Sequence, residues 1–445
     1  MPESPQRGTS FRLCHRAIDL STGRATFAYD LDGVAFEEQV VLPVGSVRPP
    51  AAALEVLLDV AHAALGTSYF KLSAPRVLAF DRPVTAEVVD LSRQIYDEGL
   101  REFAVVNGLP VPLETEIVAE LRATPLPDAP PSASCTRPLL PIGGGKDSAA
   151  VLTLLPWATA VTITATPAQR RLTAAAGVEL LEVTRTLDPR LAERTAAGGL
   201  NGHIPITAVN SALSTLTAAL NGHDCVVFGN ERSANEPTRT IDGVPVNHQH
   251  SKSFAFEEGF AHAVAPAGVG YFSLLRRLSG LSVAGIVAAN RRLRDDFLSC
   301  NRSFKRSRRP DDPQTWCLEC PKCLSTVLAF APFLSPAEVD HTFGGNPLGH
   351  ESLVDEFRAL WDVEAKPFEC VAEMAESAVA MAWLAADDDW QSFSVVKALA
   401  DEATGAAADL RASMTDLLRP AGPHLVPDDL AALVEASAAA VQPRR

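Results

Sequence analysis

The chain has 445 residues, of which 47% are hydrophobic and 21% are charged. This composition is that of a globular protein with two or three domains and a sizeable core. A formal net charge of −15 at pH 7 argues against a general nucleic-acid-binding protein. No apolar run suggests a membrane span and the first ten residues are too polar for a signal peptide, so we expect a cytoplasmic protein without a membrane partner.

Residues 1–134 predict an accessory α+β domain. Residues 25–29 and 34–42 alternate like strands around an Asp-Gly turn, which predicts a hairpin. Apolar spacing predicts helices over 49–64 and 85–107. The stretch 124–138 is rich in Pro, Ala and Ser and is the best candidate for a linker.

A glycine-rich motif organises the next part of the chain. It follows a short apolar strand and opens an apolar helix, and it consists of Gly143, Gly144, Gly145, Lys146, Asp147 and Ser148. Glycines at a helix N-terminus let backbone N–H groups approach an anion. Lys146 adds a positive charge, while Asp147 and Ser148 offer oxygen ligands for Mg²⁺. The spacing fits neither the dinucleotide fingerprint nor the Walker loop; it predicts nucleotide binding, and the alternative is a plain turn before a helix.

Strands and helices alternate after this loop. Strand patterns cover 160–164, 178–183 and 224–229, with helical patterns over 168–176 and 206–220. Such alternation predicts an α/β fold with a doubly wound parallel sheet, which binds ligands at the carboxyl ends of its strands. We place this catalytic domain at residues 135–335. The alanine-rich residues 336–445 predict a helical region, which is better explained as a structural cap than as an independent functional unit.

A dense polar segment follows the strand at 224–229. Its candidates for substrate binding are Asn230, Arg232, Asn235, Glu236 and Asn247. His248, His250 and Lys252 are candidate proton carriers, because modest burial brings the pKa of both residue types near neutrality. The alternative is a solvated surface loop, which would favour Asp, Glu and Lys over this mixture of residues.

Four of the eight cysteines lie close together in the sequence, at Cys300, Cys317, Cys320 and Cys323. Four thiolates that leave no open position favour a structural zinc site. An iron–sulfur cluster and reduced thiols without metal are the alternatives. For the eight cysteines of a cytoplasmic chain we expect mostly thiols or metal ligands rather than disulfides.

A basic segment lies between Arg291 and Arg309, where eight residues are Lys or Arg. This local reversal of charge in an acidic chain favours a phosphate or carboxylate ligand, with Arg302 and Arg306 as the best candidates. The alternative is a solvated loop.

The motifs together resemble a known family. The glycine loop is similar to the signature of the PP-loop ATP pyrophosphatases, with Gly143 where that family usually has Ser, and the cysteine cluster is similar to the zinc site of cyano-deazaguanine synthases. The order of the glycine loop and of residues 230–236, 246–254, 299–304, 316–323 and 367–371 resembles the UDP-N-acetylmuramoyl-L-alanyl-L-glutamate epimerases of bacterial cell-wall synthesis.

This resemblance implies a PP-loop type of sheet and an ATP-dependent reaction. The terminal L-glutamate of UDP-N-acetylmuramoyl-L-alanyl-L-glutamate would be adenylated, deprotonated at Cα and reprotonated on the opposite face, giving the D-glutamyl product, AMP and pyrophosphate. Adenylation removes the carboxylate charge that makes the α-proton hard to take.

The resemblance also implies roles for particular residues. The glycine loop with Lys146 and Ser148 would bind the ATP phosphates, and Asp147 with Glu231 would bind Mg²⁺. Arg302 and Arg306 would hold the carboxylate or diphosphate of the substrate. Cys370 is an additional candidate proton carrier, because thiols serve other glutamate epimerases in this way.

Two other functions fit parts of the pattern. Another adenylating PP-loop enzyme would form an amide or a nitrile or modify tRNA, but the chain shows no recognisable glutaminase or rhodanese segment and no broad basic surface. A non-enzymatic nucleotide-binding regulator would bind ATP without releasing pyrophosphate. The sequence leaves the oligomeric state open.

Overall fold

The computed structural model describes residues 6–125, 135–304, 315–362, 364–405 and 409–444. Its strands are β1 (Ser10–Asp19), β2 (Arg24–Leu31), β3 (Val34–Val41), β4 (Val77–Phe80), β5 (Glu116–Val118), β6 (Pro138–Pro141), β7 (Thr159–Ile163), β8 (Leu180–Thr186), β9 (Cys225–Phe228), β10 (Arg239–Ile241), β11 (Val244–Val246) and β12 (Gly270–Ser273). Its α-helices are α1 (Ala51–Phe70), α2 (Ala86–Tyr96), α3 (Arg101–Val106), α4 (Lys146–Leu154), α5 (Pro167–Ala176), α6 (Arg190–Ala196), α7 (Ile206–Asn221), α8 (Phe254–Val264), α9 (Gly280–Ala289), α10 (Arg291–Arg294), α11 (Pro321–Phe330), α12 (Pro336–Phe343), α13 (Val354–Arg358), α14 (Met374–Ala385), α15 (Ser394–Gly405), α16 (Leu410–Leu418) and α17 (Asp428–Ala439).

Ten of the strands form one continuous sheet in the order β12-β9-β6-β7-β8-β3-β2-β1-β4-β5. The strands β12, β9, β6, β7 and β8 run parallel, and β3 joins β8 antiparallel, with Gln39 opposite Thr186. The sheet therefore crosses the expected domain boundary at residues 134 and 135 without a break. The α/β class with a large, mostly parallel sheet is confirmed, while the division into three domains stays a prediction.

Helices cover both faces of this sheet, because its central strands are apolar on both sides. On β6, Leu139 belongs to one core and Leu140 to the other, and Val226 and Val227 of β9 divide in the same way. Successive side chains of a strand point to opposite faces, so one strand serves two cores. The first core includes buried residues of α1, α2, α7 and α8, and the second includes those of α4, α9 and α11.

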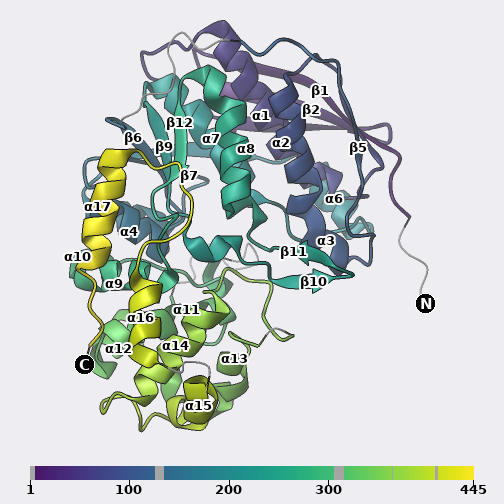
Figure 1. Ribbon diagram of the computed structural model, residues 1–445. Helices are drawn as coiled ribbons and strands as arrows, with labels where there is room; N and C mark the ends of the chain where they lie inside the picture. The colour runs from purple at the N-terminus through teal and green to yellow at the C-terminus, as the bar shows by residue number, and fades with distance from the viewer. Residues whose placement is uncertain (1–5, 126–134, 305–314, 363, 406–408, 445) are drawn as a thin grey trace.

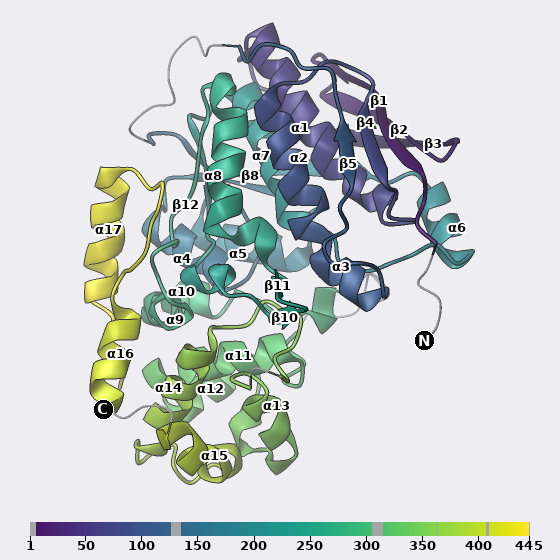
Figure 2. The ribbon, with the colours of Figure 1, turned by 45° about the vertical axis from the view of Figure 1, so that its right-hand side comes forward.

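The helical region at the C-terminus is also confirmed. Helices α12 to α17 follow one another from Pro336 onward, and Figures 1 and 2 show α11 to α15 gathered at the lower end of the molecule, beyond β10 and β11. The predicted linker at 124–138 falls largely outside the described residues, and β6 begins at its last residue, Pro138.

Helix α1 corrects the expectation that no apolar segment is long enough to span a bilayer. It has 20 residues with a mean hydropathy of 1.2 and passes that test by length and composition. However, 78% of its most apolar window is buried inside the protein, where it packs beside α7. It is therefore a core helix of the α/β fold.

The helix predicted over 85–107 is broken in the structure into α2, a short 3₁₀ turn at Glu98–Leu100 and α3. Gly99 in this turn lies against Pro205, and a Cβ atom added to it would sit 3.1 Å from the proline ring. The break redirects the chain, and α3 then carries Glu102 toward the polar segment that follows β9.

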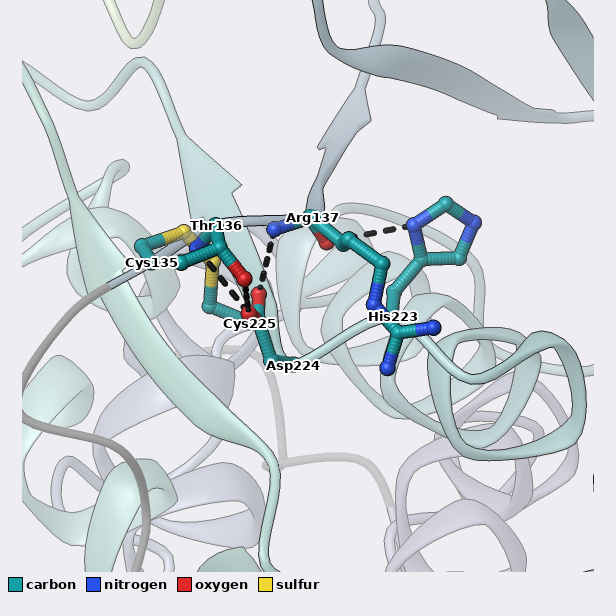
Figure 3. The surroundings of a disulfide bond; sticks show 6 residues. All are labelled: Cys135, Thr136, Arg137, His223, Asp224 and Cys225. Carbon is teal, nitrogen blue, oxygen red and sulfur yellow. Dashed lines mark hydrogen bonds between the residues drawn. A yellow bond between two sulfur atoms is a disulfide. The ribbon is translucent and has the colours of Figure 1, made fainter.

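The starts of β6 and β9 are tied together (Figure 3). Cys135 and Cys225 form a disulfide with their Cα atoms 5.8 Å apart. Asp224 accepts hydrogen bonds from the backbone N–H groups of Thr136 and Arg137, each at 2.9 Å. This pair is an exception to the expectation of mostly thiols or metal ligands, because neighbouring parallel strands place the two cysteines within disulfide distance. The other six cysteines are free.

Candidate active site

The glycine loop lies between the carboxyl end of β6 and the first turn of α4, as the sequence predicts. Gly144 has φ of +87°, a conformation that side chains disfavour, and a Cβ atom on Gly145 would lie 2.6 Å from the Ser299 hydroxyl. The backbone N–H groups of Gly143 and Gly144 donate to Oγ of Ser148 at 3.0 and 3.2 Å. The loop thus gathers N–H groups and a hydroxyl at a helix N-terminus, the arrangement that binds anions.

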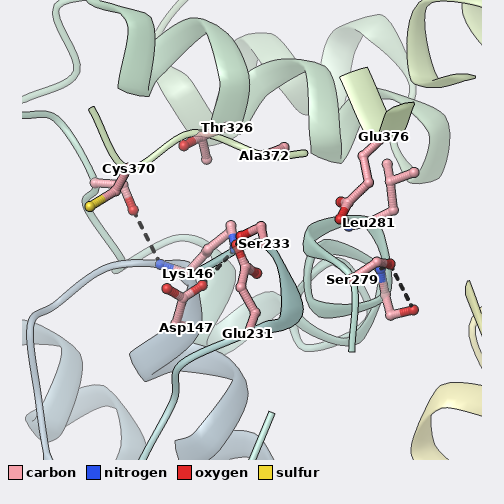
Figure 4. A network of polar contacts seen from close by, with 12 residues as sticks. Lys146, Asp147, Glu231, Ser233, Ser279, Leu281, Thr326, Cys370, Ala372 and Glu376 are labelled. Carbon is pink, nitrogen blue, oxygen red and sulfur yellow. Dashed lines mark hydrogen bonds and ion pairs between the residues drawn. The ribbon is translucent and has the colours of Figure 1, made fainter. Parts of the chain in front are cut away.

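A buried lysine holds two carboxylates together beside this loop. Nζ of Lys146 lies 2.6 Å from Asp147 and 2.5 Å from Glu231. Burial alone lowers the pKa of Lys146, but the two carboxylates outweigh it and raise the pKa. Figure 4 shows these three side chains meeting at one point, between Cys370 and Glu376. Residues predicted from two distant motifs are therefore brought together in one charged centre.

Buried Arg276, which the sequence does not single out, holds the backbone of the polar segment after β9 in place. Its guanidinium is 1% exposed and pairs at 2.6 Å with Glu257 of α8, also 1% exposed. It donates to the backbone carbonyl oxygens of Glu231 at 3.2 Å and Lys252 at 2.6 Å. One buried side chain thereby sets the positions of two candidate site residues.

A second charged group forms around Cys370, which is partly buried. The ammonium of Lys252 donates to its sulfur at 3.2 Å, and the imidazole of His248 is hydrogen-bonded to the same sulfur. Nδ1 of His248 lies 2.5 Å from Oε2 of Glu102, which comes from α3 in the N-terminal part of the chain. The ring of His203 lies 4.5 Å from the His248 ring.

These contacts change the ionisation of both partners. Burial alone raises the pKa of Cys370, but Lys252 and His248 outweigh it and lower the pKa to about 5. Burial alone lowers the pKa of His248, but its hydrogen bonds to Cys370 and Glu102 raise the pKa to about 9. A thiolate and an imidazolium are therefore the stable forms between these two values.

His250 does not join this group. Its Nδ1 lies 3.5 Å from Glu98, and its Nε2 has no hydrogen-bond partner among the described residues. Burial lowers the pKa of His250 to about 4. Of the three predicted proton carriers, the structure thus brings His248 and Lys252 to Cys370 and leaves His250 on a separate contact.

The predicted substrate-binding residues of the polar segment lie nearby and have partners within the protein. Asn230 donates to Ser273 at 3.0 Å, Asn247 donates to the Ala234 carbonyl at 2.8 Å, and the Asn235 side chain accepts from the Phe254 N–H at 2.7 Å. Arg232 pairs with Glu373, and Glu236 pairs with Lys366. The last two partners show that residues 366–376 cover the site.

Glu376 is a further buried carboxyl group at this site that the sequence does not reveal. One of its oxygens accepts from the Leu281 N–H at 3.0 Å, and the other has no partner among the described residues. Burial, together with Glu373 and Glu231, raises the pKa of Glu376 from 4.5 to about 8.

We expect Glu376→Gln to remove a pH dependence of stability. Because the native carboxyl group holds its proton up to a higher pH than the unfolded one, its contribution to stability is complete below pH 4.5 and is lost as pH rises to about 8. Between these values the variant should gain on the wild type by up to about 1.4 kcal/mol per pH unit in the free energy of unfolding. Urea unfolding at several pH values measures this difference, and parallel curves for the two proteins would contradict it.

A cavity of about 250 Å³ opens beside the charged centre at the carboxyl ends of β6, β7 and β9. Gly143, Asp147, Asn230 and Lys252 line its polar side, and apolar side chains including Val161 and Phe228 line the rest. This position is where parallel α/β sheets bind ligands. A larger cavity of about 570 Å³ lies among α14, α16 and α17 and contains none of the predicted site residues.

The four clustered cysteines converge in space. The Sγ atoms of Cys300, Cys317, Cys320 and Cys323 all lie within 4.8 Å of one another. Those of Cys317 and Cys323 are 3.8 Å apart, close to the separation of about 3.8 Å expected between thiolates around tetrahedral zinc. The N–H of Cys320 donates to the Cys317 sulfur at 3.3 Å. The geometry therefore fits a closed four-thiolate metal site.

The basic segment is only partly described. Arg302 lies at the surface, about half exposed, and pairs with Glu319 at 2.5 Å. Arg294 is 2% exposed and contacts Asp295 and Glu338, so it is part of the core. The other candidate, Arg306, lies outside the described residues, as do its neighbours 305 and 307–314.

Fold and site together define an α/β enzyme with its charged centre at the carboxyl edge of a parallel sheet. The family model of the MurL N-terminal domain matches residues 2–274, and that of the MurL C-terminal domain matches residues 296–414. The chain therefore belongs to the UDP-N-acetyl-alpha-D-muramoyl-L-alanyl-L-glutamate epimerase family.

Curated relatives carry this family name. One from Micromonospora sp. is 39% identical over 442 residues, covering 96% of this chain and 97% of the relative. One from Salinispora tropica is 36% identical over 455 residues, covering 97% and 98%. One from Xanthomonas oryzae pv. oryzae is 39% identical over 405 residues, covering 87% and 88%. No solved structure gives a significant match.

Proposed function

We propose that this protein converts the terminal L-glutamate of UDP-N-acetylmuramoyl-L-alanyl-L-glutamate to D-glutamate in peptidoglycan synthesis, using ATP to activate the carboxylate. The named relatives support the substrate and the epimerisation. The observation that carries the ATP step is Lys146, held between Asp147 and Glu231 beside a glycine loop and a cavity. We propose that the sheet is of the PP-loop type for the same reason.

The physical reason for activation is charge. Removing the Cα proton beside a free carboxylate would leave two negative charges on adjacent atoms. Once the carboxylate oxygen is bonded to the α-phosphorus of ATP, the acyl group carries no carboxylate charge and its carbonyl can accept the electron pair. The N–H groups of Gly143 and Gly144 with Lys146 and Ser148 would hold the phosphates, because helix N-termini and ammonium groups stabilise anions.

Magnesium fits this centre as well. Asp147 and Glu231 are carboxylates that meet at one point, and hard cations prefer such oxygen ligands. Bound there, Mg²⁺ would neutralise phosphate charge, while Lys146 keeps the two carboxylates together without the nucleotide. Further substrate contacts are proposed for the polar segment after β9, with Asn230 lining the cavity and Arg232, Asn235, Glu236 and Asn247 nearby in sequence. Arg302 and Arg306 are the proposed partners of the substrate's carboxylate or diphosphate. A cytoplasmic location belongs to the same proposal, because ATP is supplied there.

We further propose that the four cysteines hold a structural zinc ion. Wild-type protein should then carry about one zinc per chain, and Cys320→Ser should lose it and become less stable. Elemental analysis after dialysis measures the metal, and Cys14→Ser on β1, outside the cluster, is the matched control. Iron with acid-labile sulfide, or no metal in the wild type, would contradict the proposal.

The proposed reaction is tested with ATP, Mg²⁺ and the UDP-linked dipeptide in heavy water, followed by chiral analysis of the glutamate. Pyrophosphate release, deuterium at Cα and a D-glutamyl product are the expected results. Pyrophosphate release without inversion would instead indicate another adenylating enzyme. ATP binding without release of pyrophosphate in the presence of this substrate would favour a non-enzymatic nucleotide-binding regulator.

A further inference from the structure

Resting on the proposed function, we infer that Cys370 is the base that takes the Cα proton, and that Glu102, His248 and Lys252 are positioning residues that keep it a thiolate. The elements that build this group come from three parts of the chain: α3, the polar segment after β9 and the segment before α14. Their side chains meet although Glu102 is 146 residues from His248 and Lys252 is 118 residues from Cys370 in the sequence.

The contacts form a chain that ends at the thiol. Glu102 holds Nδ1 of His248 at 2.5 Å, and His248 is hydrogen-bonded to the sulfur of Cys370. A carboxylate behind an imidazole fixes the orientation of the ring and stabilises its protonated form. Lys252 adds a second positive charge, 3.2 Å from the sulfur. Two cations directed at one sulfur stabilise its ionised form.

Lys252 connects the thiol with the cavity beside the nucleotide centre. Lys252 contacts Cys370 and at the same time lines the cavity that Asp147 and Gly143 border. Figure 4 places Cys370 across from Lys146 and Asp147, the residues proposed to hold the nucleotide. For Cys370 to act as the base, an acyl group activated at that centre must present its Cα atom toward this side of the cavity.

Charged groups on all neighbouring elements act on the sulfur. Besides Lys252 and His248, Lys322 of α11 lies close enough to favour the thiolate, while burial opposes it. The balance lowers the pKa of Cys370 to about 5. Such a thiol is ionised at neutral pH and needs no further base to prepare it.

The Cα–H bond breaks, its electron pair passes into the enolate of the acyl adenylate, and the proton goes to Sγ of Cys370, which becomes a neutral thiol. The enolate then takes a solvent-derived proton on its opposite face, and the thiol returns its own proton to solvent. Deuterium from heavy water therefore enters the product at Cα.

Cys370→Ser separates this inference from the proposed function. The variant should lose Cα–deuterium exchange and epimerisation by about 10³-fold, the size of a general-base effect. Substrate-dependent exchange of label between pyrophosphate and ATP, which reports adenylation alone, should stay within about threefold because the nucleotide centre is intact. Cys14→Ser is the matched thiol control.

A second measurement follows the ionisation of the Cys370 thiol without catalytic turnover. Alkylation of Cys370 by iodoacetamide, followed by mass spectrometry of its peptide, should have its pH midpoint near 5 in the wild type. Glu102→Gln and His248→Gln should move this midpoint upward, because each removes support for the thiolate, whereas Glu87→Gln on α2 should not.

Proton transfer by Cys370 is contradicted if Cys370→Ser keeps Cα exchange within tenfold, or loses both partial reactions equally. A wild-type alkylation midpoint at the ordinary thiol value also overturns it. A wild type that exchanges no pyrophosphate refutes the proposed function instead, and the alkylation midpoint still decides for or against the thiolate.

Discussion

Replacing Lys146 with methionine should lower adenylation by about 10⁴-fold, as expected when the main positive charge at a phosphoryl-transfer centre is lost. Lys146 is 5% exposed, and its ammonium group contacts both Asp147 and Glu231. Without it, two buried carboxylates would face an ATP molecule that brings further negative charge. Substrate-dependent exchange of label between pyrophosphate and ATP measures the effect directly.

Two controls show whether a loss of exchange in Lys146→Met comes from the missing ammonium group. Lys397→Met removes a lysine from the exposed surface of α15, so it should leave the exchange rate unchanged. Circular dichroism shows whether the methionine variant keeps its fold. A folded Lys146→Met protein that exchanges label within tenfold of the wild-type rate would remove Lys146 from the nucleotide centre.

The second large effect is expected for Arg276→Met. This substitution leaves Glu257 charged and buried, and loss of one partner of a buried ion pair costs about 3–5 kcal/mol of stability. It also releases the carbonyl oxygens of Glu231 and Lys252, so activity should fall further than stability alone explains. Urea unfolding gives the free energy, and a rate assay of the folded fraction gives the activity.

Its neighbour in sequence is the control. Arg277 is partly exposed and pairs with Glu435, whose side chain is half exposed, so solvent screens this pair and Arg277→Met should cost much less stability than Arg276→Met. Adding Glu257→Leu to Arg276→Met should recover part of the stability, since no unpaired charge remains buried, but not the activity. Equal losses for the two arginine variants would contradict the assigned role of Arg276.

Periodic patterns in the sequence predict much of this fold, because each depends on a few neighbouring residues. The strand, glycine loop and helix at β6 and α4, and the alternation through β9, lie where the sequence predicts them. The continuity of the sheet through β3 and β8 does not follow from such patterns, since it depends on pairing between residues such as Gln39 and Thr186, far apart in the chain.

The same limit applies to the site. Glycines, clustered cysteines and the His-Lys segment carry recognisable chemistry at short spacing, so they can be read from the sequence. Glu102 cannot, because it is an ordinary glutamate on a short helix until the fold brings it to His248, 146 residues away. Arg276 and Glu376 likewise cannot be identified from the sequence, because their importance comes from their burial, which depends on how the whole chain packs.

In the proposed reaction, the glutamate carboxylate is adenylated before its Cα proton is removed. The most direct measurement uses substrate whose α-carboxylate oxygens are ¹⁸O, with mass analysis of the AMP formed. If the carboxylate attacks the α-phosphorus and water later attacks the acyl carbon, the bridging oxygen leaves with AMP, so AMP should carry one ¹⁸O atom and pyrophosphate none. D-glutamyl product formed with unlabelled AMP, or with ADP and phosphate, would contradict adenylation of this carboxylate.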